Sequence, residues 1–472
     1  MSDEKSSGGK GTVNALARIV LRADEAAFSA AAIRQAQLLL LDTIGCGLAG
    51  APEDVSRAIA DVALRDGGKG ECPLIGRAEK TGMLNAVLAN GVAVRVLDLN
   101  DYLIGESKGE PETGGHPSDL IPVALAAGAE RRCSGAAILE SIIVGYELYA
   151  RLQEMMNRSG EWDGVSVSGL VAPAMAGRLM GLEEGRLAHA MALGAARAAT
   201  PSIVRRGDMS AAKSIANALV AQAGVQAALL AERGITGPLA ILDDAKGLRD
   251  LFADGDREVL TAPIPARSAI RRAHVKTYPC INTGQSAVAA ALKLRAMLEG
   301  GVEKLSRVEI IMADYRVVKR HQEDPGRIHP LSREAADHSF PFLVAVTLID
   351  GALGSAQFEN DRWHDPKVKA LMTKIVTSRD AKWNARAPGA YPCTIRASDS
   401  GGRDFIAEIP YPPGFSQSGL DDAAVVDKFH SVAASVLDSA ARQQIVDAVM
   451  EFHHSPSTAT LDAAISTRGP SH

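Results

Sequence analysis

Hydrophobic residues recur every three or four positions through most of the first 270 residues. Between positions 82 and 97, apolar side chains stand at 84, 87, 88, 92, 96 and 97. This spacing is typical of a helix with an apolar face. The same pattern predicts further helices over 31–48, 122–130, 135–152, 171–180, 184–199 and 210–233. These stretches carry few charges, so we expect a large helical domain whose helices are buried on more than one face.

The pattern changes near residue 273. Short apolar runs at 275–280, 308–312 and 394–409 predict strands, and stretches at 286–298 and 340–350 predict helices. Prolines at 410, 412 and 413 indicate a loop, after which 423–452 is helical again. The predicted fold is mainly α. It has a flexible tail over 1–12, an all-helical domain over 13–272 and 410–460, and a smaller α+β domain inserted over 273–409.

Composition narrows the class of protein. Of the 472 residues 46% are hydrophobic but only 4% are aromatic, which favours closely packed helices with small side chains. The net charge of −5 provides no positive field for nucleic acid or an acidic membrane surface. The five cysteines include no CxxC pair, which disfavours disulfide frameworks and zinc or iron–sulfur sites. We expect a cytoplasmic protein with no metal, no cofactor and no membrane span.

His116 is the first candidate for chemistry, in Gly114-Gly115-His116-Pro117-Ser118-Asp119. Proline suits the first position of a helix, so His116 is expected at a helix N-terminus. The helix dipole there favours the neutral imidazole, which is a usable general base near pH 7. The alternative is that His116 only caps the helix. P-loop, GxSxG, HExxH and strand-linked GxGxxG motifs are absent from the sequence.

Further candidates are charged residues at predicted helix ends. Asp98 and Asp101 follow an apolar helix, where carboxylates are unfavourable without a partner, unless they are solvated turn residues. Arg205 and Arg206 precede Lys213 in the opening turn of the next helix. These cations predict a pocket for carboxylates or, alternatively, a solvated basic loop.

Two segments of the inserted domain also carry polar motifs. His274 to Cys280 precedes Gln285, which opens an apolar helix, and His338 stands near the start of another. A single histidine in such a place is more often structural than catalytic.

Together these segments resemble the MmgE/PrpD family over about residues 15–452. The matching motifs are Leu-Asp-x-Asn-Asp at 97–101, Gly-His-Pro-Ser-Asp at 115–119, Gly-Asp-Met-Ser-x-x-Lys at 207–213, Gly-Ile-Thr-Gly-Pro at 234–238, Lys-x-Tyr-Pro with Gln-Ser-Ala-Val at 276–288, and Ala-Asp-His-Ser-Phe-Pro-Phe at 336–342. The resemblance implies a homodimer in which the α+β domain closes as a lid over a cleft. It also implies catalytic roles for Asp98, His116, Lys213 and Asp101. The residues it implies for substrate binding are Asn100, Arg205, Arg206, Lys276, Tyr278, Gln285 and His338.

The chain departs from the family pattern in one important place. Relatives commonly carry a second histidine in Trp-Asp-His-Val, whereas this chain reads Trp162-Asp163-Gly164-Val165. Tyr102 also replaces a common threonine, and 105–114 looks like a polar insertion. The other motifs are most similar to the 2-methylcitrate dehydratase branch. We therefore expect a metal-independent hydro-lyase that acts on a citrate-like polycarboxylate by His/Lys acid–base catalysis. Decarboxylation, epimerisation or a non-catalytic carboxylate-binding role are the alternatives.

Overall fold

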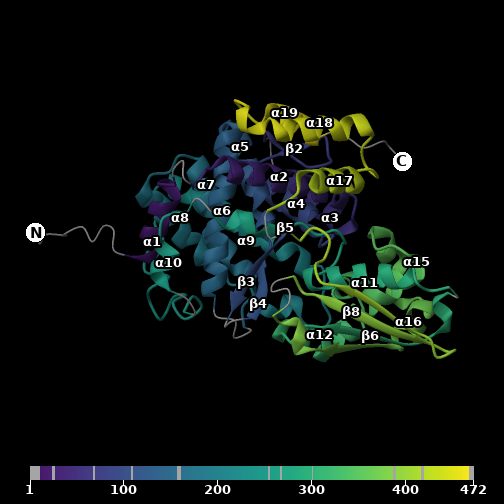
Figure 1. Ribbon diagram of the computed structural model, residues 1–472. Coiled ribbons are helices and arrows are strands. Elements are labelled where there is room, and N and C mark those ends of the chain that lie inside the picture. Colours follow the sequence, from purple (N-terminus) through teal and green to yellow (C-terminus); the bar gives the residue numbers. More distant parts are fainter. Residues whose placement is uncertain are drawn as a thin grey trace, which may run out of the picture.

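The larger part of the protein is a helical unit, coloured purple to teal in Figure 1. The computed structural model describes residues 11–23, 27–66, 70–107, 110–156, 161–253, 256–265, 268–299, 301–385, 390–415 and 419–466. The helices of this unit from the first half of the chain are α1 (Thr12–Leu21), α2 (Ala30–Gly50), α3 (Asp54–Asp66), α4 (Met83–Arg95), α5 (Ile121–Arg131), α6 (Gly135–Met155), α7 (Ser168–Leu179), α8 (Glu184–Ala195), α9 (Ala212–Glu232) and α10 (Arg257–Thr261).

Small side chains let the central helices approach closely. A Cβ atom built on Gly91 of α4 would lie 2.9 Å from the Cβ of Ala218 in α9. One built on Gly224 of α9 would lie 2.7 Å from Cδ of Pro173 in α7. Helix α9 has the length and mean hydropathy (1.4) of a membrane-spanning helix, yet 61% of that stretch is buried inside the protein. Its apolar character therefore matches that of a core helix.

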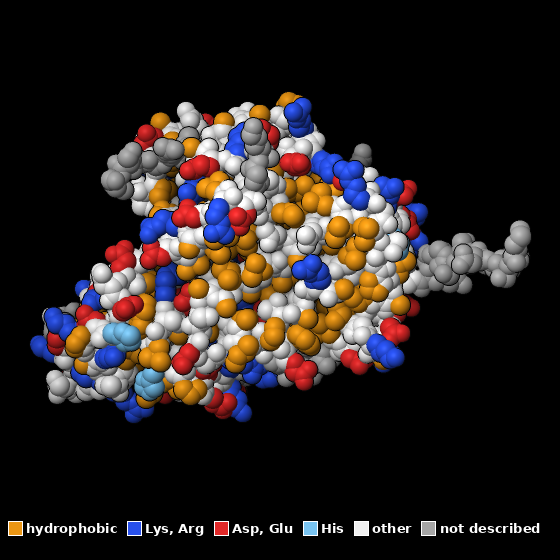
Figure 2. All heavy atoms as spheres, turned by 180° about the vertical axis from the view of Figure 1, so that it is seen from behind, with side chains coloured by type: hydrophobic (Ala, Val, Ile, Leu, Met, Phe, Trp, Pro, Cys, Tyr) orange, Lys and Arg blue, Asp and Glu red, His pale blue; other side chains and the backbone are white. Residues whose placement is uncertain are grey.

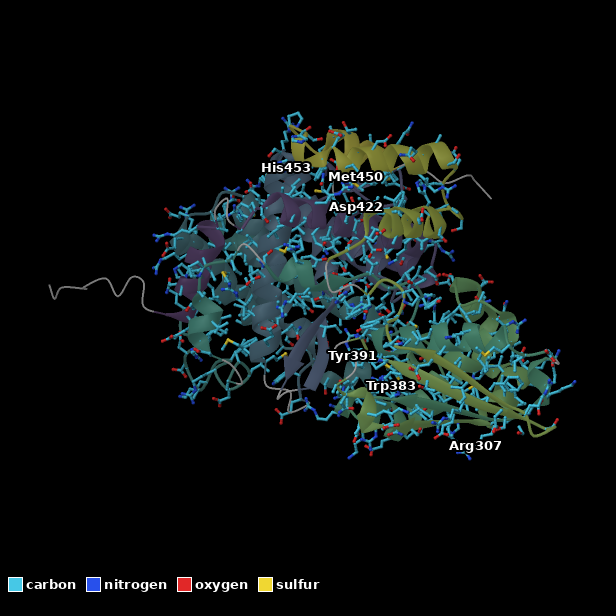
Figure 3. All side chains as sticks on the ribbon, in the orientation of Figure 1. Arg307, Trp383, Tyr391, Asp422, Met450 and His453 are labelled. Carbon is cyan, nitrogen blue, oxygen red and sulfur yellow. The ribbon has the colours of Figure 1, made fainter. Side chains whose placement is uncertain are left out.

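The C-terminal segment returns to this helical unit. Helices α17 (Asp422–Val432), α18 (Ser439–Met450) and α19 (Ala459–Ile465), yellow in Figure 1, share a hydrophobic core with α1, α2, α5 and α6. The side chain of Gln37 in α2 donates a 2.6 Å hydrogen bond to the backbone oxygen of Met450, and Arg34 forms an ion pair with Asp422 (Figure 3).

The second unit is an α+β structure with its own hydrophobic core. Its sheet has the order β7-β6-β8-β9, in which β6 runs parallel to β7 and antiparallel to β8. Helices α11 and α15 pack together beside this sheet, and the side chains of Trp383 and Tyr391 are buried in the same core (Figure 3). The elements are α11 (Gln285–Arg295), β6 (Leu305–Met312), α12 (Arg316–Glu323), α13 (Pro325–Ile328), α14 (Arg333–Ala336), α15 (Phe340–Asp350), α16 (Pro366–Met372), β7 (Ile375–Arg379), β8 (Cys393–Asp399) and β9 (Asp404–Ile409).

The mainly helical prediction is confirmed. The predicted domain limits and the role of the second unit as a lid stay predictions. Residues 1–10 of the predicted tail lie outside the described residues, and Thr12 already begins α1.

Residues of the stretch 105–114, expected to be a polar insertion, belong to a hairpin of β3 (Tyr102–Ser107) and β4 (Glu110–Gly115), and their status as an insertion stays a prediction. One local expectation is wrong. The strand expected over 275–280 is absent, because the backbone N–H groups of Thr277 and Tyr278 donate to the Gln285 side chain instead of to a neighbouring strand. Only β5 (Ala273–His274) pairs there, with β3, while β1 (Cys72–Pro73) and β2 (Lys80–Thr81) form a separate pair.

Candidate active site

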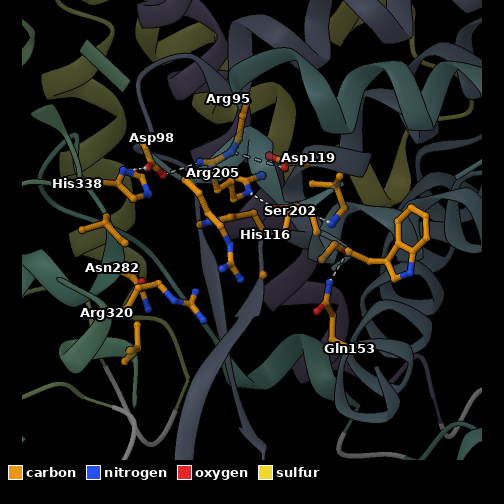
Figure 4. A pocket seen from close by; sticks show the side chains of 18 of the residues that line it. Arg95, Asp98, His116, Asp119, Gln153, Ser202, Arg205, Asn282, Arg320 and His338 are labelled. Carbon is orange, nitrogen blue, oxygen red and sulfur yellow. Dashed lines mark hydrogen bonds and ion pairs between the residues drawn. The ribbon is translucent and has the colours of Figure 1, made fainter. Parts of the chain in front are cut away.

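A cavity of about 210 Å³ lies between the two units (Figure 4). The helical unit contributes the turn after α4 and the segments around three short helices, η1 (Pro117–Leu120), η2 (Gly164–Val167) and η3 (Ser202–Arg205). The α+β unit contributes Ile281, Asn282, residues of α12 and α13, and His338. The cavity therefore gathers residues separated by up to 243 positions in the chain, from Arg95 to His338.

Asp98 is the hub of the charged groups. Helix α4 ends at Arg95, and Asp98 follows with a φ of +50°, a left-handed conformation that aspartate tolerates better than most residues. Its carboxylate accepts from Arg95 at 2.5 Å, from Lys276, and from Lys213 at 3.3 Å. Lys276 also donates to the Asp98 backbone oxygen at 2.9 Å. Burial alone would raise the pKa of Asp98, but these three cations hold it well below its usual value.

Lys213 connects this hub to the α+β unit. Its ammonium group lies 2.8 and 2.9 Å from the two carboxylate oxygens of Asp337. Asp337 in turn accepts a hydrogen bond from Nδ1 of His338, which is also 3.7 Å from Asp98. Burial opposes ionisation of Asp337, whereas Lys213 and His338 lower its pKa. The Lys213 side chain is only 2% exposed and does not line the cavity, so it reaches the site through two carboxylates.

His116 lines the cavity as the residue that precedes η1, with Pro117 at the first helical position as predicted. Its Nδ1 lies 2.6 Å from the backbone oxygen of Asp101. A carbonyl oxygen only accepts, so Nδ1 carries the hydrogen and Nε2 keeps the lone pair. Burial and the charges of Arg95 and Lys276 hold the pKa of His116 well below its usual range. The neutral imidazole is therefore explained mainly by burial and neighbouring cations, not by the helix dipole.

Asp101 and Asn100 are fully buried beneath the turn that carries His116, so neither is a solvated turn residue. The Asp101 carboxylate accepts from the hydroxyl groups of Ser118 and Tyr146, the latter at 2.9 Å. Burial raises the pKa of Asp101 to about 7. Asn100 donates to Ser118 and Asp119 at 2.8 Å each. Both residues therefore position the turn that carries His116, and neither faces the cavity.

Five arginines form a basic wall beyond this network. Arg205 forms a 2.6 Å bond with Asp163, and Arg206 is exposed at the cavity mouth. Arg316 and Arg320 come from α12, and Arg327 from α13. Burial and the nearby charge of Arg320 lower the pKa of Arg327 to about 10, and Arg205 adds to this effect. Such crowding of like charges favours an anion with several negative groups.

The space beside Gly164 is occupied by Gln153. The Gln153 amide nitrogen donates a 2.6 Å hydrogen bond to the Gly164 backbone oxygen (Figure 4). A Cβ on residue 164 would lie 3.0 Å from this nitrogen and 3.2 Å from the amide oxygen. Both residues line the cavity, so an amide stands where the family pattern has an imidazole.

Besides Asn100, three more of the predicted substrate-binding residues do not line the cavity. Lys276 is fully buried against Asp98. Gln285 is also fully buried; its amide oxygen accepts from two backbone N–H groups, and its nitrogen donates to the Tyr278 backbone oxygen at 2.9 Å. Tyr278 belongs to this pinned loop. These contacts support the fold of the loop, and direct binding by the three residues stays a prediction.

The sequence interpretation missed Asp337, Gln153 and the arginines of α12 and α13. Asp337 precedes His338 in the Ala-Asp-His-Ser-Phe-Pro-Phe motif at 336–342, and a carboxylate next to a histidine could have indicated this pair. Arg316, Arg320 and Arg327 belong to a polar stretch that contains no recognised motif. Asp98, Asp337 and His338 each offer one atom within 4.8 Å of the others, a spacing compatible with a metal ion. Because the Lys213 ammonium group already lies on both carboxylates, we describe them as an ion-pair network.

The model of the MmgE/PrpD N-terminal domain matches residues 14–260, and that of the C-terminal domain matches residues 278–451. The chain belongs to the MmgE/PrpD family. The sequence prediction of this family is confirmed.

The MmgE/PrpD relatives include lyases with two activities. The chain is 22% identical to a cis-aconitate decarboxylase from Aspergillus terreus over 444 residues, covering 89% of this chain and 88% of the relative. It is 23% identical to the human cis-aconitate decarboxylase over 460 residues, covering 93% and 91%. It is 24% identical to 2-methylcitrate dehydratase from Salmonella typhimurium over 445 residues, covering 88% and 89%. Relatives of both activities thus match nearly the full chain at similar identity.

Proposed function

We propose that this protein is a hydro-lyase that removes water from a citrate-like polycarboxylate, without a metal ion, in the cavity between the two units. The observation that carries the proposal is the neutral His116 facing the same cavity as a wall of arginines. Arginine side chains match the planar geometry of carboxylates and remain charged at neutral pH.

The chemistry requires a proton to leave a carbon next to a carboxylate. Such a proton is a weak acid, and the negative charge that develops on the carboxylate must be stabilised by cations placed in advance. Arg205 and Arg327 are anchored by the protein and provide this charge. His116 is one acid–base group, since it lines the cavity and its Nε2 keeps a lone pair while Nδ1 contacts Asp101. Asp98 and Lys213 fix the surrounding charges, and Asp101 holds the His116 ring through its backbone oxygen.

The second candidate activity is decarboxylation. It is favoured by the cis-aconitate decarboxylases among the relatives. The two reactions differ in the bond that breaks, carbon–oxygen for dehydration and carbon–carbon for loss of CO₂. The same arginines would hold the remaining carboxylates in either case.

The activity is tested by proton NMR of the purified protein with citrate, 2-methylcitrate and cis-aconitate as separate substrates. We expect an olefinic tricarboxylate to form from a hydroxy acid. Release of CO₂ from cis-aconitate instead would favour the decarboxylase, and inversion at one carbon an epimerase. Stabilisation of the protein by these acids without turnover of any of them would indicate a non-catalytic binding protein.

We also propose a cytoplasmic homodimer. A groove of about 590 Å³ lies between α4 and α9 and is lined by apolar side chains that include Leu84, Ile215 and Leu219. Leu219 is 46% exposed, and hydrophobic side chains gather over the face seen in Figure 2. A large exposed apolar surface is typical of an interface. Light scattering is expected to give twice the chain mass, and Leu219→Glu to reduce it to one chain.

A further inference from the structure

Two imidazoles line the cavity among the described residues, His116 from the helical unit and His338 from the α+β unit. The Nδ1 atom of His338 lies against the carboxylate of Asp337, which is ionised and can only accept. Nδ1 therefore carries the hydrogen, and Nε2 of His338 holds a lone pair. The ring is fixed in the same tautomer as His116, but by a carboxylate instead of a carbonyl oxygen.

Both rings are neutral before the reaction, since burial and Lys213 lower the pKa of His338 to about 3 and the pKa of His116 lies well below its usual range. They differ in the group that orients each ring and in the charges closest to it. His338 lies beside the carboxylates of Asp337 and Asp98, the latter at 3.7 Å, and both stabilise an imidazolium ion. Arg95 and Lys276 act on His116 in the other direction and favour its neutral form. When the environments of two titratable groups differ in this way, one is suited to take up a proton and the other to give one up.

We propose that His338, oriented by Asp337, is the catalytic base that removes the carbon-bound proton, and that His116 is the acid that protonates the departing hydroxyl group. This inference rests on the proposed dehydration. The negative substrate favours protonation of His116, which takes its proton from solvent as the complex forms.

The step then balances in atoms and electrons. Nε2 of His338 takes the proton from the carbon next to a carboxylate, and the C–H electron pair moves onto that carboxylate as an enediolate, which can be reprotonated from solvent. The same electron pair then forms the carbon–carbon double bond. The carbon–oxygen bond breaks with its electron pair on oxygen, which accepts the proton of His116 and leaves as water. His338 afterwards returns its proton to solvent. The carboxylates of Asp337 and Asp98 stabilise the new imidazolium at His338 against burial and the charge of Lys213, and Arg95 and Lys276 lose a neighbour of like charge when His116 gives up its proton.

Asp337 and Lys213 are positioning residues in this scheme. Lys213 keeps Asp337 ionised through contacts of 2.8 and 2.9 Å, and Asp337 fixes the His338 ring. The scheme also gives a role to a histidine of the α+β unit in a chain that lacks the histidine expected at position 164. Catalysis then requires both units, because each contributes one of the two proton-transfer groups.

Deuterium exchange separates the two histidines. Citrate is incubated with each variant in D₂O, and NMR follows both exchange of the carbon-bound hydrogen and formation of the olefin. We expect His338→Gln to lower both rates by at least about 10²-fold. His116→Gln should lower olefin formation to a similar extent while exchange continues. His329→Gln is the matched control, since His329 is exposed and lies outside the cavity lining, and it should keep both rates.

Several results would overturn the inference. Wild-type rates in His338→Gln would exclude the residue as the base, and exchange that is lost only in His116→Gln would reverse the two roles. Absence of both turnover and exchange in the wild type would refute the proposed function together with this inference. Turnover by wild type and His338→Gln alike would refute the inference alone.

A second variant guards against a defect in folding. His338→Ala leaves space beside the cavity. If a free base can replace the side chain, added imidazole should raise the rate of this variant at least about tenfold. Thermal stabilisation by citrate, equal to that of the wild type, would show that the variant is folded and binds. A citrate-stabilised variant that imidazole does not rescue would count against His338 as a base.

Discussion

Placing the histidine of the family pattern at position 164 should destabilise the protein unless Gln153 is replaced at the same time. In Gly164→His, the new Cβ would lie 3.0 and 3.2 Å from the two polar atoms of the Gln153 amide, so this amide would have to move. The hydrogen bond of 2.6 Å from Gln153 to the Gly164 backbone oxygen would be broken or displaced. Forcing extra atoms into a packed site costs about 1–3 kcal/mol.

This magnitude predicts a measurable loss of thermal stability. Each kcal/mol shifts Tm by about 2–4 °C for a unit of 150–250 residues and by less for a larger one, so Gly164→His should lower Tm by up to about 12 °C. Gln153→Ala in the same chain removes the obstructing amide and should recover at least half of that loss. The assay is differential scanning fluorimetry of the two single variants, the double variant and the wild type.

The four Tm values form a double-mutant cycle. Residues in contact are expected to be non-additive by about 0.5–3 kcal/mol. Gly164→Ala, which adds only the Cβ, should show a smaller loss than Gly164→His. Additive effects of Gly164→His and Gln153→Ala would refute the conclusion that Gln153 fills the place of the missing imidazole.

Three further predictions concern the charged network. His116→Ala is expected to lower kcat by at least about 10²-fold with the fold intact; unchanged turnover would remove His116 from the mechanism. Lys213→Met leaves Asp337 without its ammonium partner and should lower kcat more than it raises KM, whereas an increase in KM alone would indicate that Lys213 binds substrate directly. Asp101, whose pKa is raised to about 7, contributes stability that is present below pH 4 and is lost as pH rises through about 7. Asp101→Asn should therefore flatten the fall of Tm between pH 4 and 8, and an unchanged slope would contradict the raised pKa.

The helices of the first 270 residues could be predicted because their apolar spacing is regular. The stretch around residues 82–97 became α4, and 135–152 became most of α6. The β3–β4 hairpin could not be predicted, because its second strand reads Glu-Pro-Glu-Thr-Gly-Gly and shows no alternation of apolar residues. Its pairing is set by the register with β3, which depends on the fold and not on local composition.

The sequence predicts which residue types belong to the site, but not which groups their side chains contact. Asp98 and His116 were singled out by their positions at helix ends, and both line the cavity. Lys213 stands in the first turn of α9 as expected, but its ammonium group is held by carboxylates, one of them 124 residues further along the chain. Gln285 matched a motif, yet it binds the backbone of its own loop. Such pairings follow from how distant segments pack, which no local pattern records.

The most direct test of the central claim is a crystal structure of the wild-type protein grown with citrate. The account predicts citrate in the cavity between the two units, with carboxylates in contact with Arg205 or Arg327 and with Nε2 of both His116 and His338 facing the carbon chain. Citrate bound elsewhere, or a cavity closed by side chains at saturating citrate, would contradict it.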